Sequence, residues 1–142
     1  MNQRRVVVTG AGAITPVGNN LKDYWAGLVG GKSGAGPITL FDAKNFKTRF
    51  ACEVKDFVPT DFIDRKEARK LDRFCQFAMV VVEEAVAISG LEAQKINPER
   101  AGVVWGSGIG GMHTFFDGCA SFGKNPEIPR FSPFFIPKLI SD

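Results

Sequence analysis

The pattern of hydrophobic and polar positions along the chain predicts an alternation of strands and helices. Residues 4–10 (RRVVVTG) and 101–107 (AGVVWGS) contain continuous apolar runs rich in valine, which is typical of buried strands. Residues 50–57 (FACEVKDF) place an apolar side chain at every second position from Phe50 to Val54, which predicts a half-buried strand. These strands, with the helices described next, indicate an α/β fold.

The strongest helical signal lies in residues 72–89, where apolar residues recur with the period of a helix. They are Phe74, Phe77, Ala78, Val81, Val82, Ala85 and Ile88, and together they form a broad apolar stripe. A second helix is expected over residues 21–29, with Asn20 as its N-cap and Gly30 and Gly31 at its end.

Weaker signals complete the pattern. Asp64 and Glu67 have the spacing of a capping box, and Pro137 suits the first residue of a helix. Residues 32–48 are expected to form a loop, and residues 112–118 (MHTFFDG) offer a poor helix start. Because these elements leave the long helix and the aromatic tail uncovered, we interpret the chain as part of a domain.

The composition is that of a globular protein. Hydrophobic residues make up 44% and charged residues 23% of the 142 residues, which excludes disorder. The net charge of +3 is mild and no basic run is interleaved with aromatic residues, so we expect no nucleic-acid partner. The apolar runs are too short to cross a membrane and no secretory signal is evident, so we expect a cytoplasmic protein without membrane contact.

The cysteines and the histidine do not have the spacing of a metal site. Cys52, Cys75 and Cys119 are odd in number and contain no C-x-x-C pair, and His113 stands alone. We interpret the cysteines as buried structural thiols and expect neither a metal nor a cofactor.

A glycine-rich loop follows the second predicted buried strand. Gly106, Gly108 and Gly111 have the spacing G-x-G-x-x-G of a dinucleotide-binding turn, and Gly10 and Gly12 repeat part of it near the N-terminus. Such a turn needs a following helix N-terminus and an acidic residue further along the chain.

The surroundings of both glycine turns disfavour nucleotide binding. Thr15 and Pro16 stand where the third glycine of the first turn belongs, and Asp42 lies about 30 residues beyond the turn instead of about 20. About 20 residues beyond the second turn stand Pro129 and Arg130 instead of an acidic residue. We interpret the glycines as allowing two backbones, or a backbone and a substrate, to approach closely, and keep a Rossmann-type nucleotide-binding protein as an alternative.

Five motifs in order resemble the β-ketoacyl-acyl-carrier-protein synthases, most closely the elongating type II synthases of bacterial fatty-acid synthesis. They are RRVVVTGAGAITPVGNN at 4–20, KSG at 32–34, RKEARKLDRF at 65–74, GVVWGSGIGG at 102–111 and SPFFIP at 132–137. The resemblance covers residues 1–142 without a large gap. Polyketide ketosynthases and non-catalytic chain-length factors are alternative relatives.

The resemblance implies a thiolase-like fold of two duplicated α/β halves, layered α/β/α/β/α, in a homodimer. Residues 1–142 then correspond to the first third of the family chain and to most of its N-terminal half. The implied reaction is decarboxylative Claisen condensation of an acyl thioester with malonyl-acyl-carrier protein. The nucleophilic cysteine is expected beyond residue 142, so we expect no catalytic residue in this chain and no activity from the chain alone.

The resemblance also implies roles for residues of the acyl pocket. Ile109 matches a gate on the acyl tunnel, within a loop whose backbone is formed by Gly106, Gly108, Gly110 and Gly111. Phe135 matches a residue that crosses the dimer interface and closes the acyl pocket of the partner subunit.

A basic segment provides the implied docking surface for acyl carrier protein. Lys66, Arg69 and Lys70 share one helical face, and Arg130 adds a further basic position. The neighbouring Pro129 replaces a residue that is often basic in the family. The partner is expected to carry acyl and malonyl groups, and its docking to be steered by charge.

Overall fold

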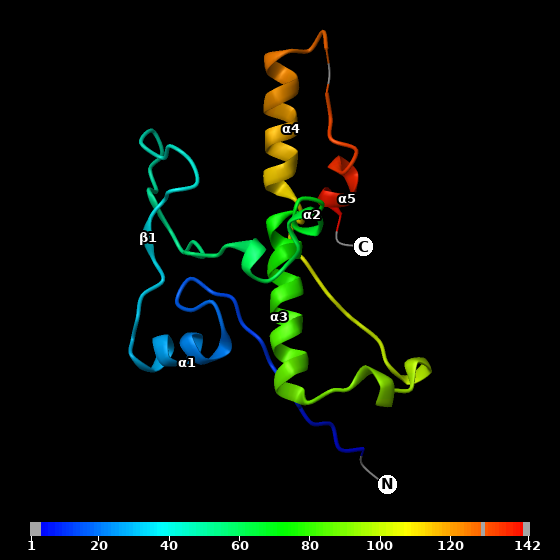
Figure 1. Cartoon of the computed structure of the whole chain (residues 1–142). Coiled ribbons are helices and arrows are strands. Elements are labelled where there is room, and N and C mark those ends of the chain that lie inside the picture. Colours follow the sequence, from blue (N-terminus) through cyan, green and yellow to red (C-terminus); the bar gives the residue numbers. More distant parts are fainter. Residues whose placement is uncertain (1–3, 129, 141–142) are drawn as a thin grey trace. The chain divides into compact units, whose positions relative to one another are not determined.

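The computed structural model describes residues 4–128 and 130–140 and is predominantly helical (Figure 1). Its α-helices are α1 (Leu21–Val29), α2 (Arg65–Ala68), α3 (Arg73–Ser89), α4 (Met112–Lys124) and α5 (Phe135–Leu139). Short 3₁₀ turns are η1 (Pro59–Asp61), η2 (Ala93–Lys95) and η3 (Pro98–Arg100), and the two strands are β1 (Gly36–Pro37) and β2 (Phe50–Ala51).

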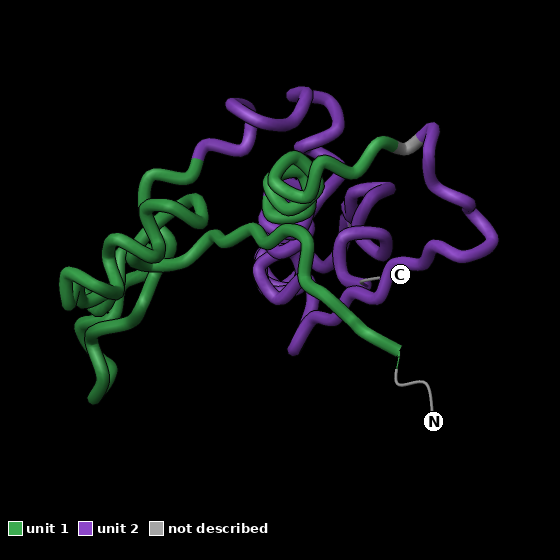
Figure 2. Tube along the Cα trace, turned by 90° about the horizontal axis from the view of Figure 1, so that it is seen from below, with its two compact units in different colours: residues 1–57, 81–92 green, residues 58–80, 93–142 purple. Residues whose placement is uncertain are grey.

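The chain forms two compact units (Figure 2), each described by itself. Unit 1 comprises residues 1–57 and 81–92, and unit 2 comprises residues 58–80 and 93–142. The α3 helix contributes its first half to unit 2 and its second half to unit 1.

The predicted helix at 21–29 is confirmed as α1. The Asn20 side chain accepts a hydrogen bond from the Asp23 backbone N–H at 2.8 Å, as an N-cap should. Gly30 is the C-cap, and Gly31 has a φ of +66°, a left-handed conformation that glycine adopts without strain.

The predicted helix at 72–89 is confirmed as α3, within one residue of its expected start. Val80 is buried, and Gly90 ends the helix with a φ of +65°. None of the helices in the described part of the chain has both the length and the apolar character needed to cross a bilayer.

In unit 1 the N-terminal glycine turn lies directly on α3. A Cβ atom added at Gly10 would come within 2.1 Å of the Ala85 carbonyl oxygen, so only glycine fits there. The Glu84 carboxylate accepts hydrogen bonds from the backbone N–H groups of Ala13 (2.9 Å) and Leu21 (2.8 Å). Because Leu21 is the first residue of α1, a carboxylate of α3 stabilises the N-terminus of α1.

The prediction of buried strands at 4–10 and 101–107 is wrong for the described chain. Both segments lack strand structure, and Val6 is 93% and Val104 99% exposed. A continuous apolar strand requires neighbouring strands and a covered face, and the one sheet among the described residues is the β1–β2 pair. The layered α/β/α/β/α arrangement therefore stays a prediction.

The β1–β2 pair corrects two further predictions. The strand expected over 50–57 is limited to Phe50–Ala51, and it pairs antiparallel with Gly36–Pro37, inside the predicted loop. Beyond Ala51 the Glu53 carboxylate accepts hydrogen bonds from the backbone N–H groups of Thr39 and Leu40 and from the Thr39 hydroxyl. These side-chain bonds replace the backbone bonds that a longer strand pair would make.

Unit 2 contains a helix that the sequence interpretation missed. Residues 112–118 form the start of the 13-residue α4 helix, although they were expected to be a poor helix start. The α5 helix begins at Phe135, so Pro137 is its third residue and not its first. Both positions lie in the first turn, where a helix leaves its backbone N–H groups unpaired and proline removes no intrahelical bond.

Candidate functional site

All the site residues expected from the sequence lie in unit 2, and all of them except Arg130 fall into two groups. One group is the glycine loop, residues 106–111, with the α5 helix beside the start of α4 (Figure 1). The other is the basic segment, residues 65–70, which contains α2 and the turn that follows it.

Two glycines of the glycine loop are required by the close approach of α5. A Cβ added at Gly110 would come within 2.4 Å of the Leu139 carbonyl oxygen, and one added at Gly111 within 2.1 Å of the Lys138 carbonyl oxygen. Gly110 also has a φ of +81°, and the Gly111 N–H donates a 3.1 Å hydrogen bond to the Leu139 carbonyl. The expectation that glycines permit close approach of two backbones is therefore confirmed for Gly110 and Gly111.

The other two glycines of the loop have more space. A Cβ added at Gly106 or Gly108 would meet nothing within 4 Å in the described chain. Ile109, between these positions and the anchored glycines, is 76% exposed. The Ser107 hydroxyl accepts a hydrogen bond from the Gly110 N–H at 3.0 Å, so the loop is closed at its base while its one large side chain is exposed.

Phe135 packs on α4. Its ring occupies the space that a side chain at Gly118 would need, with the ring edge 2.5 Å from an added Cβ. The Phe131 ring lies 5.1 Å from that of Phe135 and 6.1 Å from that of Phe122. The structure therefore brings the two predicted acyl-pocket elements together on α4 and α5, with the Ile109 loop at one end of α5 and Phe135 at the other.

The N-terminus of α4 is held by a side chain from a distant part of the sequence. Its N-cap is Gly111, which has no side chain to accept a hydrogen bond from the first turn. The Asp72 carboxylate, only 6% exposed, takes that role by accepting bonds from the Thr114 N–H at 3.2 Å and from the Thr114 hydroxyl. Sequence reasoning missed Asp72 because no local capping signal precedes α4.

Carboxylates thus occupy the helix starts that follow both glycine turns. Glu84 bonds the first turn of α1 and Asp72 bonds the first turn of α4. A nucleotide phosphate needs these same N–H groups and would be repelled by the two carboxylates. Nucleotide binding is therefore disfavoured because carboxylates already accept hydrogen bonds from the first turns of α1 and α4. The expected lack of a helix after the second glycine turn is not the reason, because α4 follows that turn.

The basic segment begins with a well-formed cap. The Asp64 carboxylate accepts hydrogen bonds from the backbone N–H groups of Lys66 (2.8 Å) and Glu67 (3.4 Å). Glu67 forms an ion pair with Lys70 at 2.7 Å, so part of the positive charge of the segment is offset. Lys66 and Arg69 are exposed, and we expect them to provide more of the unpaired charge than Lys70.

Arg130 lies apart from the basic segment. It belongs to the exposed stretch that joins α4 to α5, and this stretch leaves α4 at the end remote from α2 (Figure 1). The stretch that carries Arg130 thus begins at the opposite end of α4 from the basic segment. Pro129, the position expected to lack a family basic residue, lies outside the described residues.

The three cysteines differ in exposure. Cys52 and Cys119 are exposed, so the interpretation of buried structural thiols is wrong for both, while Cys75 is half-buried. Burial, with a smaller contribution from the Asp72 carboxylate, raises the pKa of the Cys75 thiol. A raised pKa lowers the thiolate fraction, which is the opposite of what a nucleophilic cysteine needs. Within the described ranges no group of three or more metal-ligating side chains occurs.

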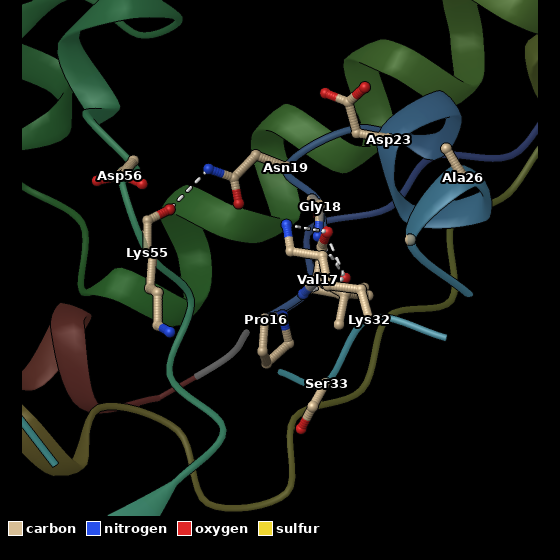
Figure 3. Close-up of a pocket in the computed structure, with 12 residues that line it drawn as sticks. Pro16, Val17, Gly18, Asn19, Asp23, Ala26, Lys32, Ser33, Lys55 and Asp56 are labelled. Atoms are coloured by element: carbon tan, nitrogen blue, oxygen red, sulfur yellow. Dashed lines mark hydrogen bonds between the residues drawn. The ribbon is translucent and has the colours of Figure 1, made fainter. Parts of the chain in front are cut away.

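A pocket of about 540 Å³ lies in unit 1 and was not foreseen from the sequence (Figure 3). The Lys32 ammonium donates to the Val17 carbonyl at 3.1 Å, and the Asn19 amide donates to the Lys55 carbonyl at 2.7 Å. Two lysines and two aspartates line the pocket, so its charges balance. The polar groups hold the turns around the pocket and do not converge on one ligand charge.

Comparison with known proteins places the whole chain in one family. Residues 3–141 match the family model described as "Beta-ketoacyl synthase, N-terminal domain". The chain is 48% identical, over its full length, to 3-oxoacyl-[acyl-carrier-protein] synthase 2 of Synechocystis, and 47% identical over 99% of its length to the protein of that name from Coxiella burnetii. It covers 34% of each of these relatives, so it spans about a third of their length.

Solved structures of ketosynthases share the fold of the chain. The ishigamide ketosynthase/chain length factor matches 97% of the chain with a TM-score of 0.86 and 31% identity, while the chain covers 34% of that structure. A type II polyketide ketosynthase in complex with its acyl-carrier protein matches 97% of the chain with a TM-score of 0.75 and 25% identity, and 35% of it is covered. The chain belongs to the β-ketoacyl synthase family and contains sequence of its N-terminal domain.

Proposed function

We propose that the intact protein containing this chain is a condensing enzyme of fatty-acid elongation. It joins an acyl thioester to malonyl-acyl-carrier protein and forms 3-oxoacyl-acyl-carrier protein. The observation that carries this proposal is the unbroken similarity of the chain, at 44–48% identity, to proteins named 3-oxoacyl-[acyl-carrier-protein] synthase 2.

The reaction needs a nucleophile outside residues 1–142. A cysteine thiolate accepts the acyl group, malonyl-carrier loses CO₂, and the resulting carbanion attacks the acyl thioester and expels the thiolate. Neither Cys52, Cys75 nor Cys119 lies in the family's cysteine motif, and the raised pKa of Cys75 suits none of these steps. The 142-residue chain is therefore expected to be inactive by itself.

The glycine loop and α5 contribute to the acyl pocket. Ile109 is the gate, carried on a loop whose base is fastened to α5 through Gly111 and Leu139. An apolar side chain that is 76% exposed in the described chain is suited to contact a fatty-acyl chain. Phe135, the first residue of α5, packs on α4 and closes the acyl pocket of the partner subunit in a homodimer.

The basic segment docks the acyl carrier protein. Lys66, Arg69 and Lys70 provide the main positive charge, and Arg130 provides a separate contact. The solved ketosynthase bound to its own acyl-carrier protein is a relative in which this kind of complex occurs. Such docking depends on charge and weakens as salt increases. The protein acts in the cytoplasm.

The chain forms most of one half of a layered, thiolase-like fold. The exposed apolar segments 4–10 and 101–107 then pair with strands contributed by other parts of the intact protein. This proposal accounts for exposed valine side chains in segments that have the composition of buried strands.

The test is an assay of the purified intact protein with acyl-acyl-carrier protein and malonyl-acyl-carrier protein. Mass spectrometry should detect 3-oxoacyl-acyl-carrier protein and release of CO₂, whereas residues 1–142 alone should give neither. Absence of the product from correctly folded intact protein would contradict the proposal.

A non-catalytic chain-length-factor or polyketide relative is the second candidate. It is favoured by the TM-score of 0.86 to a structure that contains a chain length factor. A cysteine at the family's nucleophile position in the intact protein separates a synthase from a chain-length factor.

Nucleotide binding is tested by a thermal shift with NAD and NADP, and we expect no shift.

A further inference from the structure

We propose that Asp72 is a positioning residue that fixes the glycine loop, and thereby controls the acyl chain lengths that the intact enzyme accepts. The inference rests on the proposed function for its substrate. The evidence that Asp72 fixes the glycine loop comes only from contacts within unit 2.

The Asp72 carboxylate bonds both polar groups of one residue in the first turn of α4. It accepts from the Thr114 N–H at 3.2 Å and from the Thr114 hydroxyl, and it is 6% exposed. Hydrogen bonds to a buried charged group are among the stronger ones in proteins. Because Gly111 has no capping side chain, the Asp72 carboxylate takes the place of one in the first turn of α4.

Hydrogen bonds also connect Asp72 to the start of α3 and, through Gln76, to the end of α2. The Asp72 carbonyl oxygen accepts a 3.0 Å bond from the Gln76 N–H at the start of α3. The Gln76 side-chain amide then donates to the Ala68 carbonyl at 2.9 Å, at the end of α2. A continuous set of hydrogen bonds therefore runs from the basic segment through Asp72 to α4.

The glycine loop immediately precedes this fixed point. On one side its base is attached to the Leu139 carbonyl through the Gly111 N–H, and on the other it leads directly into the turn capped by Asp72. Ile109 is only two residues before Gly111. Loss of the cap should loosen the first turn of α4 and let Ile109 move more freely, which favours entry of longer acyl chains.

The experiment compares four variants of the intact protein with the wild type. Asp72→Asn removes the charge, Thr114→Val removes the hydroxyl donor, and Thr114→Ser keeps both donors. Glu84→Gln is the matched control, because Glu84 also bonds a helix N-terminus from α3 but does so at α1 in unit 1. Hydrogen exchange of amides 107–115 and kcat/KM for long and short acyl-carrier substrates are measured.

Asp72→Asn and Thr114→Val should increase exchange of amides 110–115 by about tenfold. They should raise the long-to-short ratio of kcat/KM by about threefold or more. Thr114→Ser and Glu84→Gln should change neither quantity.

Wild-type exchange in both Asp72→Asn and Thr114→Val would overturn the proposal, as would an equal increase in exchange in Glu84→Gln. Increased exchange with an unchanged ratio would overturn the control of chain length. If the wild-type protein made no 3-oxoacyl product, the proposed function would fail, while the exchange data would still decide whether Asp72 fixes the loop.

Discussion

Gly12 lies directly against Val81 on α3, so that a Cβ added to it would be 2.2 Å from the Val81 carbonyl oxygen. The N-terminal turn therefore packs backbone on backbone, and any side chain at position 12 would separate the two segments. Since both residues belong to unit 1, this contact is part of its internal packing.

Gly12→Ala should destabilise the intact protein by about 1–3 kcal/mol, the usual cost of overpacking. Gly123→Ala is the control, because a Cβ there would meet nothing within 4 Å and the residue lies in α4. The control should be neutral or up to about 1 kcal/mol more stable. Denaturant unfolding measures both, and equal effects of the two substitutions would contradict the packing argument.

Ile109→Phe should restrict the intact enzyme to shorter acyl chains, because an aromatic ring in place of the smaller isoleucine side chain would narrow the proposed acyl tunnel. We expect kcat/KM for long acyl substrates to fall by roughly tenfold or more relative to short ones. Ile109→Val, which keeps a small branched side chain, should retain the wild-type preference. An unchanged preference in Ile109→Phe would remove Ile109 from the acyl pocket.

Reversing charge at Lys66 and Lys70 together should weaken binding of acyl carrier protein by about tenfold at low salt, with less effect at high salt. Reversing charge at Lys44 and Lys47 together provides the control, because it changes the net charge by the same amount and both lysines are exposed in unit 1, Lys44 in an ion pair with Asp42. Titration calorimetry or fluorescence anisotropy gives the Kd values. Equal losses in both proteins would indicate a general effect of net charge and no local docking surface.

Glu53 should show a pH-dependent contribution to the stability of the β1–β2 region. The Thr39 hydroxyl donates a 2.7 Å hydrogen bond to its carboxylate and, with the backbone N–H groups of Thr39 and Leu40 and the charge of Lys55, holds the pKa of Glu53 below its usual value. Because this pKa is lowered by folding, the contribution is complete above the pKa of the unfolded state and is lost as pH falls through the folded value.

Thr39→Val should move the pKa of Glu53 back toward its usual value, as measured by NMR titration of the carboxyl carbon. Thr60→Val, in unit 2, should leave it unchanged. A pKa of Glu53 that does not respond to Thr39→Val would show that another group lowers it.

Elements with local signals were predicted well from the sequence. The α1 helix has Asn20 to accept a hydrogen bond from the Asp23 N–H, and glycines to end it. The α3 helix has an apolar stripe with helical period that is too long for a strand. The Asp64 cap of α2 was also recognised, while the Glu67 side chain forms an ion pair with Lys70. In these cases the stabilising groups lie within a few residues of one another.

Elements that depend on distant residues were either missed or wrongly predicted. The α4 helix begins at a glycine, and its capping carboxylate, Asp72, is 42 residues away in the sequence. Residues 4–10 and 101–107 have strand composition, but a strand forms only with a neighbour, and the described chain offers none. The glycine loop was located correctly, while its attachment to Leu139 could only be seen in three dimensions.

Condensing activity is measured by incubating the purified intact protein with acyl- and malonyl-acyl-carrier protein and analysing the carrier by mass spectrometry. We expect a 3-oxoacyl-carrier product two carbons longer than the acyl donor. Intact protein that is folded and binds acyl carrier protein, yet forms no such product, would contradict the proposed function.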